Sequence, residues 1–245
     1  MSSSRFKTGA GAWVTPFNPN AIVTDSYTEA NAWQSYFVPH DVPGLIRNLG
    51  GDEKFVARLD EVFDSKEQII NFSEDVVGLI GMYAHGNEPC HHYAYLYNYA
   101  GQPWKTQARI RQICRTLYSN TTAGMCGNDD CGQMSAWYVF SALGFYPVDP
   151  CGGVYVIGSP LASRATITLD PRPYKGGKFS VIARDNSPQN IYIQSATLNG
   201  KPLTRTWITH DQIVAGGTLE LQMGPAPNRS WGAAPTDRPG IAPAH

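Results

Sequence analysis

The spacing of apolar residues changes near Tyr146, and this change constrains the fold more than any other feature of the sequence. Before Tyr146, apolar residues recur at helical spacing in segments separated by Pro, Gly or Asx residues. After it, short β-rich runs lie between turn residues. A chain of 245 residues is long enough for one large domain or two small ones. We therefore predict an α+β fold, helical first and β-rich second.

The positions of the turn residues set the expected bounds of the helices and strands. We predict helices at 28–37, 43–50, 52–63, 74–85, 88–101, 103–118 and 131–145. We predict strands at 154–160, 165–170, 178–184, 191–200, 206–213 and 218–223. The Asn199-Gly200 pair is typical of a tight hairpin turn, which favours an antiparallel unit. The expected division is a helical part at 1–147, a β-rich unit at 148–232 and a disordered tail at 233–245.

Composition excludes several classes of function. The formal net charge is -1 and no run of Lys or Arg occurs, which argues against nucleic acid or an anionic membrane as partner. No apolar stretch approaches the roughly 20 residues that span a bilayer. The first residues, MSSSRFKTGAGAW, lack the apolar core of a signal peptide. The 5 cysteines are odd in number and form no CxxC pair, so neither a zinc site nor a disulfide framework is supported.

The stretch GNDDCGQMSAWYVFS places Asp129 and Asp130 directly before an apolar run. Asx residues cap helix starts, and acidic side chains suit the positive end of the helix dipole. One cap needs only one side chain, however, and Asn128 and Gln133 are also present. The second carboxylate is therefore a candidate for chemistry. Capping alone and a catalytic role both remain open.

Glu29 opens another expected helix, in YTEANAWQ. It is either an acid favoured by the helix dipole or a proton donor whose pKa is raised by desolvation in an aromatic cleft. Two carboxyl groups facing each other across a cleft are the minimum machinery for cleaving a glycosidic bond. Glu29 is then the candidate acid, and Asp130 or Asp129 the candidate base. For inversion, the two carboxyl groups need to be roughly 6.5 to 9.5 Å apart.

The stretch AHGNEPCHHYAYLYNYAG combines oxygen ligands with histidines. Asn87 and Glu88 offer hard oxygen atoms in a turn, which suits calcium rather than zinc. His85, His91 and His92 do not have a usual zinc spacing. The alternative is that this stretch only starts a helix and fills the core, since Pro commonly occupies the first helical position.

These blocks together carry a family resemblance. YTEANAWQ, VPHDV, HGNEPCHHYAYLYNYAGQPWKTQ, GNDDCGQMSAWYVFSALGFYPV and YVIGSP occur in that order between about Trp13 and Pro160. They resemble the signature blocks of glycoside hydrolase family 92, the calcium-dependent exo-acting α-mannosidases. The resemblance implies an inverting hydrolysis of terminal α-linked mannose on a scaffold that is an (α/α) toroid.

The resemblance also implies roles for particular residues. Glu29 matches the general acid, Asp130 the general base, and Asp129 stands beside the base. Asn87 and Glu88 match the calcium-binding block, where Ca²⁺ holds the mannose 2- and 3-hydroxyls. The residues expected to contact substrate are Trp13, Asn31, Trp33, His85 and Asn128.

The resemblance covers only part of such an enzyme. Family members are much longer, with an N-terminal β-sandwich and a full ring of helices. We therefore expect half of an (α/α) toroid followed by a small antiparallel β unit, acting on mannose-containing glycans. The family suggests a secreted or periplasmic location. The alternative is a truncated, non-catalytic fragment, or a subunit that needs a separate chain for the missing half.

Overall fold

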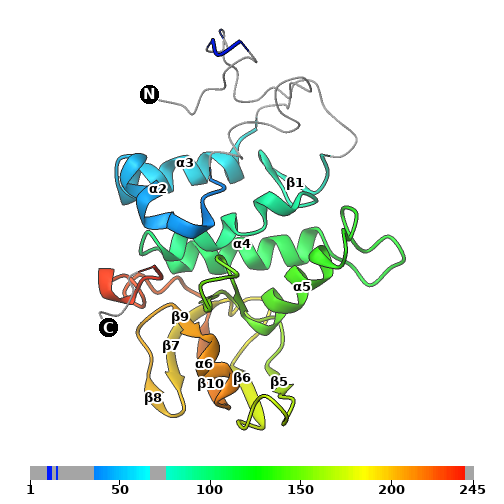
Figure 1. The fold of residues 1–245 in the computed structure, drawn as a ribbon, viewed down its shortest axis with the longest axis vertical. Coiled ribbons are helices and arrows are strands. Elements are labelled where there is room, and N and C mark those ends of the chain that lie inside the picture. The colour runs from blue at the N-terminus through cyan, green and yellow to red at the C-terminus, as the bar shows by residue number, and fades with distance from the viewer. Residues whose placement is uncertain (1–9, 13–14, 16–35, 67–75, 241–245) are drawn as a thin grey trace.

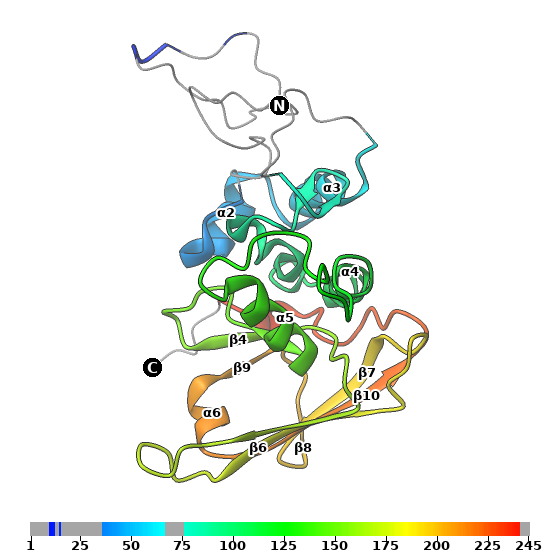
Figure 2. The ribbon, with the colours of Figure 1, turned by 90° about the vertical axis from the view of Figure 1, so that its right-hand side faces the viewer.

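The structure of the protein, a computed structural model, describes residues 10–12, 15, 36–66 and 76–240. Its described elements stack in four layers (Figure 2). Helices α2 (Val42–Asn48) and α3 (Asp52–Asp64) form the first layer, and α4 (Pro103–Thr116) and α5 (Gln133–Leu143) the second. A small sheet and then a larger sheet follow (Figure 2). The predicted α+β class is confirmed in the described residues, whereas the half toroid stays a prediction.

The described strands form three sheets. The small sheet has the order β3-β4-β9, from β3 (Phe145–Tyr146), β4 (Val154–Ile157) and β9 (Trp207–Thr209). The larger sheet has the order β5-β6-β10-β7-β8. Its strands are β5 (Arg164–Thr168), β6 (Lys178–Arg184), β7 (Tyr192–Leu198), β8 (Lys201–Pro202) and β10 (Gly217–Gly224). A hairpin of β1 (Leu79–Ile80) and β2 (Tyr83–Ala84) lies in the helical part.

The small sheet separates two apolar cores because its side chains alternate between its faces. Tyr146 pairs with Val156, and both belong to the core of the helical part. Phe145 pairs with Ile157, and both belong to the core of the β part. One short pair of strands therefore contributes to both cores, and the predicted change near Tyr146 coincides with the boundary between them.

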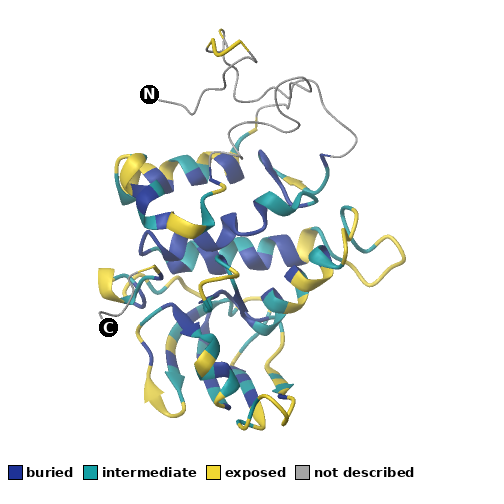
Figure 3. Cartoon of the chain, viewed as in Figure 1, coloured by how far each residue is buried: buried dark blue, intermediate teal, exposed yellow. Residues whose placement is uncertain are grey.

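Helix α4 lies at the centre of the molecule and links its two parts (Figures 1 and 3). The buried Gln107 accepts a hydrogen bond through Oε1 from the backbone N of Ile193, at 3.0 Å. The buried Arg111 donates from Nε to Ser159 Oγ at 2.9 Å and from Nη2 to Asn186 Oδ1. Polar side chains of one helix thus satisfy groups of the β part.

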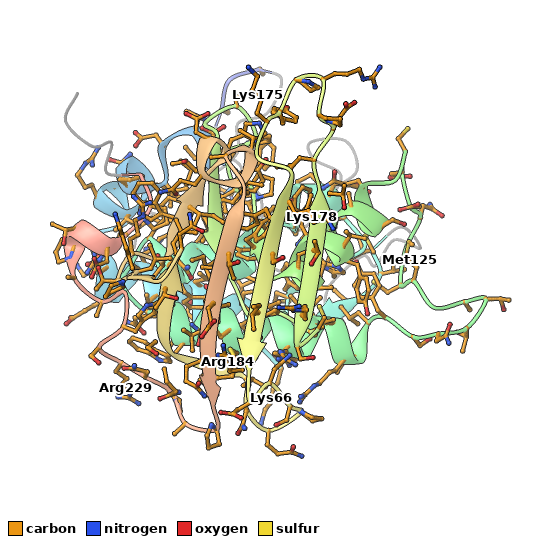
Figure 4. The ribbon with its side chains drawn as sticks, turned by 90° about the horizontal axis from the view of Figure 1, so that it is seen from below. Lys66, Met125, Lys175, Lys178, Arg184 and Arg229 are labelled. Atoms are coloured by element: carbon orange, nitrogen blue, oxygen red, sulfur yellow. The ribbon has the colours of Figure 1, made fainter. Side chains whose placement is uncertain are left out.

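The outer face of the larger sheet is polar, with Lys178 and Arg184 near opposite ends of β6 (Figure 4). On this face Arg184 donates from Nε to Glu220 Oε1 at 2.6 Å and from Nη2 to Oε2 at 3.0 Å. Both side chains lie at least partly in solvent, so this pair contributes little to stability. Alternation of polar and apolar residues along β6 accounts for the one-sided burial.

Two predicted helices are wrong. Segment 74–85 instead contains the β1-β2 hairpin in its described part, because Gly78 and Gly81 have φ of +68° and +60°. Such left-handed residues interrupt a helix and favour turns. Segment 88–101 forms two 3-10 helices, η2 (Glu88–Cys90) and η3 (Tyr93–Asn98). Every residue from Cys90 to Gly101 is buried, so packing on all sides overrides the local pattern.

Three further predictions about the β part need correction. The larger sheet is mixed, because β6 and β10 pair in parallel. The predicted strand 206–213 ends at Thr209, where a capping box with Gln212 starts α6 (His210–Val214). The predicted disordered tail contains a 3-10 helix, η4 (Pro235–Asp237), and Arg238 donates from Nη1 to Asp52 Oδ2 at 2.6 Å. Residues 233–240 therefore pack against the helical part.

We predict that Gln107→Leu lowers the free energy of unfolding by about 1 to 3 kcal/mol, because the buried N–H of Ile193 loses its acceptor. Urea unfolding measures the change. The control is Gln112→Leu on the same helix, where the half-buried amide accepts from Arg109 and the expected change is below about 0.5 kcal/mol. Equal losses in the two variants would contradict the bridging role of Gln107.

Candidate active site

Two loops that carry candidate residues touch through their glycines. A Cβ placed on Gly127 would lie 2.9 Å from the Cα of Gly86 and 3.1 Å from its carbonyl oxygen. No ordinary side chain fits such a gap, so the two backbones are in direct contact. Asn87 and Glu88 directly follow Gly86, and residues 128–130 directly follow Gly127. The loop with the candidate metal ligands and the loop with the candidate base therefore start next to each other.

The first loop is a tight turn. The backbone N of Asn87 donates to Ala84 O at 3.2 Å, and Pro89 stands in the first turn of η2. Pro has no N–H to lose there, and its fixed φ suits the start of a helical turn. Both Asn87 and Glu88 are half-buried. The turn thus holds two oxygen-bearing side chains at the edge of the core.

The second loop curls into α5 through left-handed residues. Asp130, Cys131 and Gly132 have φ of +44°, +59° and +89°. This conformation is easy for Gly and tolerated by Asp, but it costs roughly 1 to 2 kcal/mol for Cys131. The loop therefore holds strain next to the candidate base.

The two adjacent carboxylates have different surroundings. Asp129 Oδ1 accepts from the backbone N of Ser135 at 2.9 Å, and Oδ2 accepts from Ser135 Oγ at 3.0 Å. Asp129 is not the N-cap of α5, which is Gly132, but it satisfies the N–H of the third helical residue and so stabilises the first turn. Asp130 is exposed, and its carboxylate has no hydrogen-bond partner among the described residues. Of these two neighbours, Asp130 is the one whose carboxylate makes no hydrogen bond to a described residue.

The three histidines lie beneath the first loop and are buried. His85 Nδ1 lies 2.7 Å from Tyr83 Oη, and Nε2 lies 2.7 Å from Tyr118 Oη. Both ring nitrogens are thus bonded inside the core, and the position of His85 is that of a core residue. These contacts do not favour the expected contact of His85 with substrate, which stays a prediction.

His91 and His92 also bond within the core. His91 Nε2 donates to His85 O at 3.0 Å, and His92 Nε2 donates to Tyr36 O at 2.9 Å. Burial lowers the pKa of His85 to about 2 and the pKa values of His91 and His92 to about 4. The three rings are therefore neutral near pH 7. Among the described residues, no group of three or more His, Cys, Asp or Glu side chains could hold a metal ion.

An aromatic layer behind the loops is not predicted by the motifs. Trp137 on α5 is fully buried, stacks on Tyr118 with 6.0 Å between ring centroids, and donates from Nε1 to His91 O at 2.9 Å. Trp137 lies three residues after the buried Met134 and four before the buried Ser141, which is the spacing of one helix face. Trp137 supports both loops from below.

Four candidates lie outside the described residues. These are Glu29, Trp13, Asn31 and Trp33. The separation between Glu29 and Asp130 therefore stays a prediction. Asn128, by contrast, is described, and it is exposed on the second loop, beside Gly127.

The donor chemistry of the first loop suits calcium in part. Ca²⁺ takes six to eight oxygen ligands, including carboxylates, amide carbonyls and water. Asn87 and Glu88 supply two such side chains at the point where the loops meet. They fit calcium by atom type but fill only part of its coordination shell.

Comparison with known proteins decides the family. Residues 2–225 match the glycosyl hydrolase family 92 catalytic domain. The chain belongs to glycoside hydrolase family 92. A family 92 α-mannosidase from Bacteroides thetaiotaomicron in complex with mannoimidazole is similar in structure, with a TM-score of 0.88 and 39% identity. That comparison covers 97% of this chain and 32% of the mannosidase.

Two other similar proteins also exceed this chain in length. An inverting mannosidase from Bacteroides thetaiotaomicron is 40% identical with a TM-score of 0.79, over 94% of this chain and 32% of that one. An uncharacterized secreted glycosidase from Arthroderma benhamiae is 39% identical over 214 residues, which is 86% of this chain and 25% of that protein. The chain thus spans about a third or less of these relatives. No helix in the described residues is long and apolar enough to cross a membrane.

We predict that Gly127→Ala destabilises the fold by about 1 to 3 kcal/mol, because its Cβ would force the two glycine loops apart. Thermal unfolding measures the change. The control is Gly152→Ala, where the nearest atom to a Cβ is a movable carboxylate oxygen of Asp149. Unchanged stability in Gly127→Ala would contradict the contact.

We also predict that stability falls as the pH is lowered from about 6.5 toward 4. In the unfolded chain the histidines bind protons below about pH 6.5, whereas His91 and His92 stay neutral in the folded chain until about pH 4. The unfolded state binds more protons in this range, so the free energy of unfolding drops by up to about 1.4 kcal/mol per pH unit for each ring. Urea unfolding at pH 7 and pH 5 tests this.

The matched variant for this measurement is His92→Gln, which keeps a donor toward Tyr36 O and removes one titrating ring. Its stability should depend less steeply on pH over the same range. A pH dependence identical to that of the unsubstituted chain would show that His92 does not titrate as described.

Proposed function

We propose that this chain is the part of an exo-acting α-mannosidase that carries the general base and the calcium loop. The observation that carries the proposal is the contact of the two loops at Gly86 and Gly127 within a family 92 chain. It puts the free carboxylate of Asp130 and the oxygen ligands of Asn87 and Glu88 on neighbouring turns. Separate oxygen-rich turns on opposite sides of the molecule would not support one reaction centre.

In this proposal the reaction is a single displacement with inversion. Glu29, in its protonated form, gives a proton to the leaving oxygen, and Asp130 removes a proton from the attacking water. Asp129 fixes the start of α5 and so orients Asp130. The division of tasks follows from the hydrogen bonds of Asp129 to Ser135 and from the exposure of Asp130.

The calcium ion belongs to the proposal through the donor chemistry of Asn87 and Glu88. When bound, it would hold the mannose 2- and 3-hydroxyls and supply electrostatic stabilisation without proton transfer. Asn128 stands beside the base and is the candidate to orient water or sugar. Trp13, Asn31 and Trp33 are the remaining candidates for contacts with terminal mannose of a glycan.

The proposed scaffold is half of an (α/α) toroid at 1–147, followed by the β unit at 148–232. Relatives are about three times as long as the matched region, so the remaining walls of the pocket lie in sequence that this chain does not span. The second candidate function rests on this observation. A non-catalytic fragment, or a subunit completed by a separate chain, would share the same loops. A secreted or periplasmic location is proposed with the enzyme, in keeping with a relative described as secreted.

We predict that Glu29→Gln or Asp130→Asn lowers turnover of an α-mannoside by at least about 100-fold, the usual effect of removing a general acid or base. The assay measures mannose release, alone and together with a polypeptide that supplies the region spanned only by the relatives. Proton NMR of the first product shows whether β-mannose forms, as inversion requires. Chelation of calcium should also lower turnover.

The control is Asp211→Asn, an exposed carboxylate on α6, far in sequence from both loops. It should leave turnover unchanged. Near-full activity of Glu29→Gln or Asp130→Asn would overturn the role of that residue. Absence of turnover in every combination, with normal folding, would favour the non-catalytic alternative.

A further inference from the structure

Gln133, the first residue of α5, contacts the stretch that carries the calcium loop. Its Nε2 lies 3.2 Å from His91 Nδ1 and 3.3 Å from Tyr146 Oη. Gln133 is half-buried and has no part in the proposed proton transfers. Its side chain therefore connects two segments that are 42 residues apart in the sequence.

The backbones of the two partners extend this connection to the proposed reaction groups. The N–H of His91 donates to Glu88 O at 3.0 Å, and the N–H of Gln133 donates to Asp130 O at 3.3 Å. A continuous path thus runs from Glu88 through His91 and Gln133 to Asp130. Each link in this path is a hydrogen bond, and its centre is the contact between the two side chains.

The direction of the central hydrogen bond follows from the other contacts of His91. Nε2 lies 3.0 Å from the carbonyl oxygen of His85, which can only accept, so Nε2 carries the ring proton. In a neutral ring Nδ1 is then an acceptor, and the Gln133 amide is the donor. Burial lowers the pKa of His91 to about 4, which agrees with a neutral ring. A carboxylate in place of the Gln133 amide would have no proton to give.

Helix α5 holds His91 at a second point as well. Trp137 Nε1 donates to His91 O at 2.9 Å, one turn further along the same helix. Two side chains of α5 therefore fix both the ring and the backbone of His91. Any movement of the first turn of α5 moves the calcium loop with it.

We propose that the Gln133–His91 contact is a positioning clasp, which fixes the separation between the Glu88 loop and the Asp130 loop. Gln133 acts through His91 and through the backbone of Asp130, so it is a positioning residue and not a catalytic one. The importance of this separation for catalysis rests on the proposed function. The clasp itself is a property of the fold and is testable without turnover.

Hydrogen exchange of the whole chain tests the clasp. In Gln133→Leu we expect amide exchange to rise about three- to tenfold at residues 130–135 and also at 87–91, as for the loss of one hydrogen bond. The urea midpoint should stay close to that of the unsubstituted chain. The matched control is Gln194→Leu, which removes an amide that bonds Tyr192 O and Ala226 O in the β part. Exchange of both loops should be unaffected in this control.

The response of 87–91 to a change on α5 is the decisive readout, because a purely local role of Gln133 would loosen only 130–135. Unchanged exchange at 87–91 overturns the proposal. If Gln133→Leu fails to fold, Gln133→Glu decides by the same measurement, since it keeps a polar side chain but cannot donate to the neutral ring at pH 7.

Calcium-dependent thermal stability separates this proposal from the proposed function. We expect the unsubstituted chain to be stabilised by Ca²⁺ and Gln133→Leu to need about tenfold more Ca²⁺ for the same shift. A chain that shows no response to Ca²⁺ contradicts the calcium part of the proposed function. The exchange experiment then still decides whether the clasp exists.

Discussion

The direct contact between Gly86 and Gly127 is the constraint on which the arrangement of the site depends. A Cβ on Gly127 would lie 2.9 Å from the Cα of Gly86, so neither loop could come as close with larger residues at these positions. The layer below holds the loops at this distance through Trp137 and His91, which meet at 2.9 Å. Close packing against the aromatic layer thus keeps the two irregular loops at a fixed distance from each other. This is how loops on a scaffold obtain the precision that binding requires.

The helical and β parts are less independent than their patterns suggest. The change of periodicity falls near Phe145 and Tyr146, which face opposite cores. Yet Gln107 and Arg111 of α4 bond groups in the β part, and Arg238 from the end of the described chain bonds Asp52 near its beginning. Gln107 and Arg111 are buried polar groups whose hydrogen bonds are lost if the two parts separate, whereas the pair of Arg238 and Asp52 lies partly in solvent. The β unit therefore stabilises the helical part, which carries the two loops.

The spacing of apolar residues in the sequence predicts helices and strands correctly only where local preference and tertiary packing agree. The helices at α3 and α4 show regular apolar spacing, and the structure confirms them. The pattern fails at 74–85, where Gly78 and Gly81 adopt left-handed turns, and at 88–101, where burial on every side removes the solvent-facing stripe that marks a helix. Parallel pairing of β6 with β10 is a long-range property that no hairpin signal reveals. The motifs locate both loops of the candidate site, but burial of His85 depends on partners such as Tyr118, 33 residues away.

Stabilisation of the fold explains the position of the Asp129 carboxylate but not that of the Asp130 carboxylate. Asp129 uses both carboxylate oxygens to hold the first turn of α5, and one such residue is sufficient for that. Asp130 makes no such bond among the described residues and has a left-handed φ of +44°, which Asp tolerates. The backbone oxygen of Asp130 accepts from the N–H of Gln133, but its carboxylate has no structural role of this kind, which makes it the candidate for chemistry. The left-handed curl through Asp130 and Cys131 leads directly into α5, whose first residue, Gln133, contacts His91. The loop with Asp130 and the loop with Asn87 and Glu88 are therefore joined both by their glycines and by this side-chain contact.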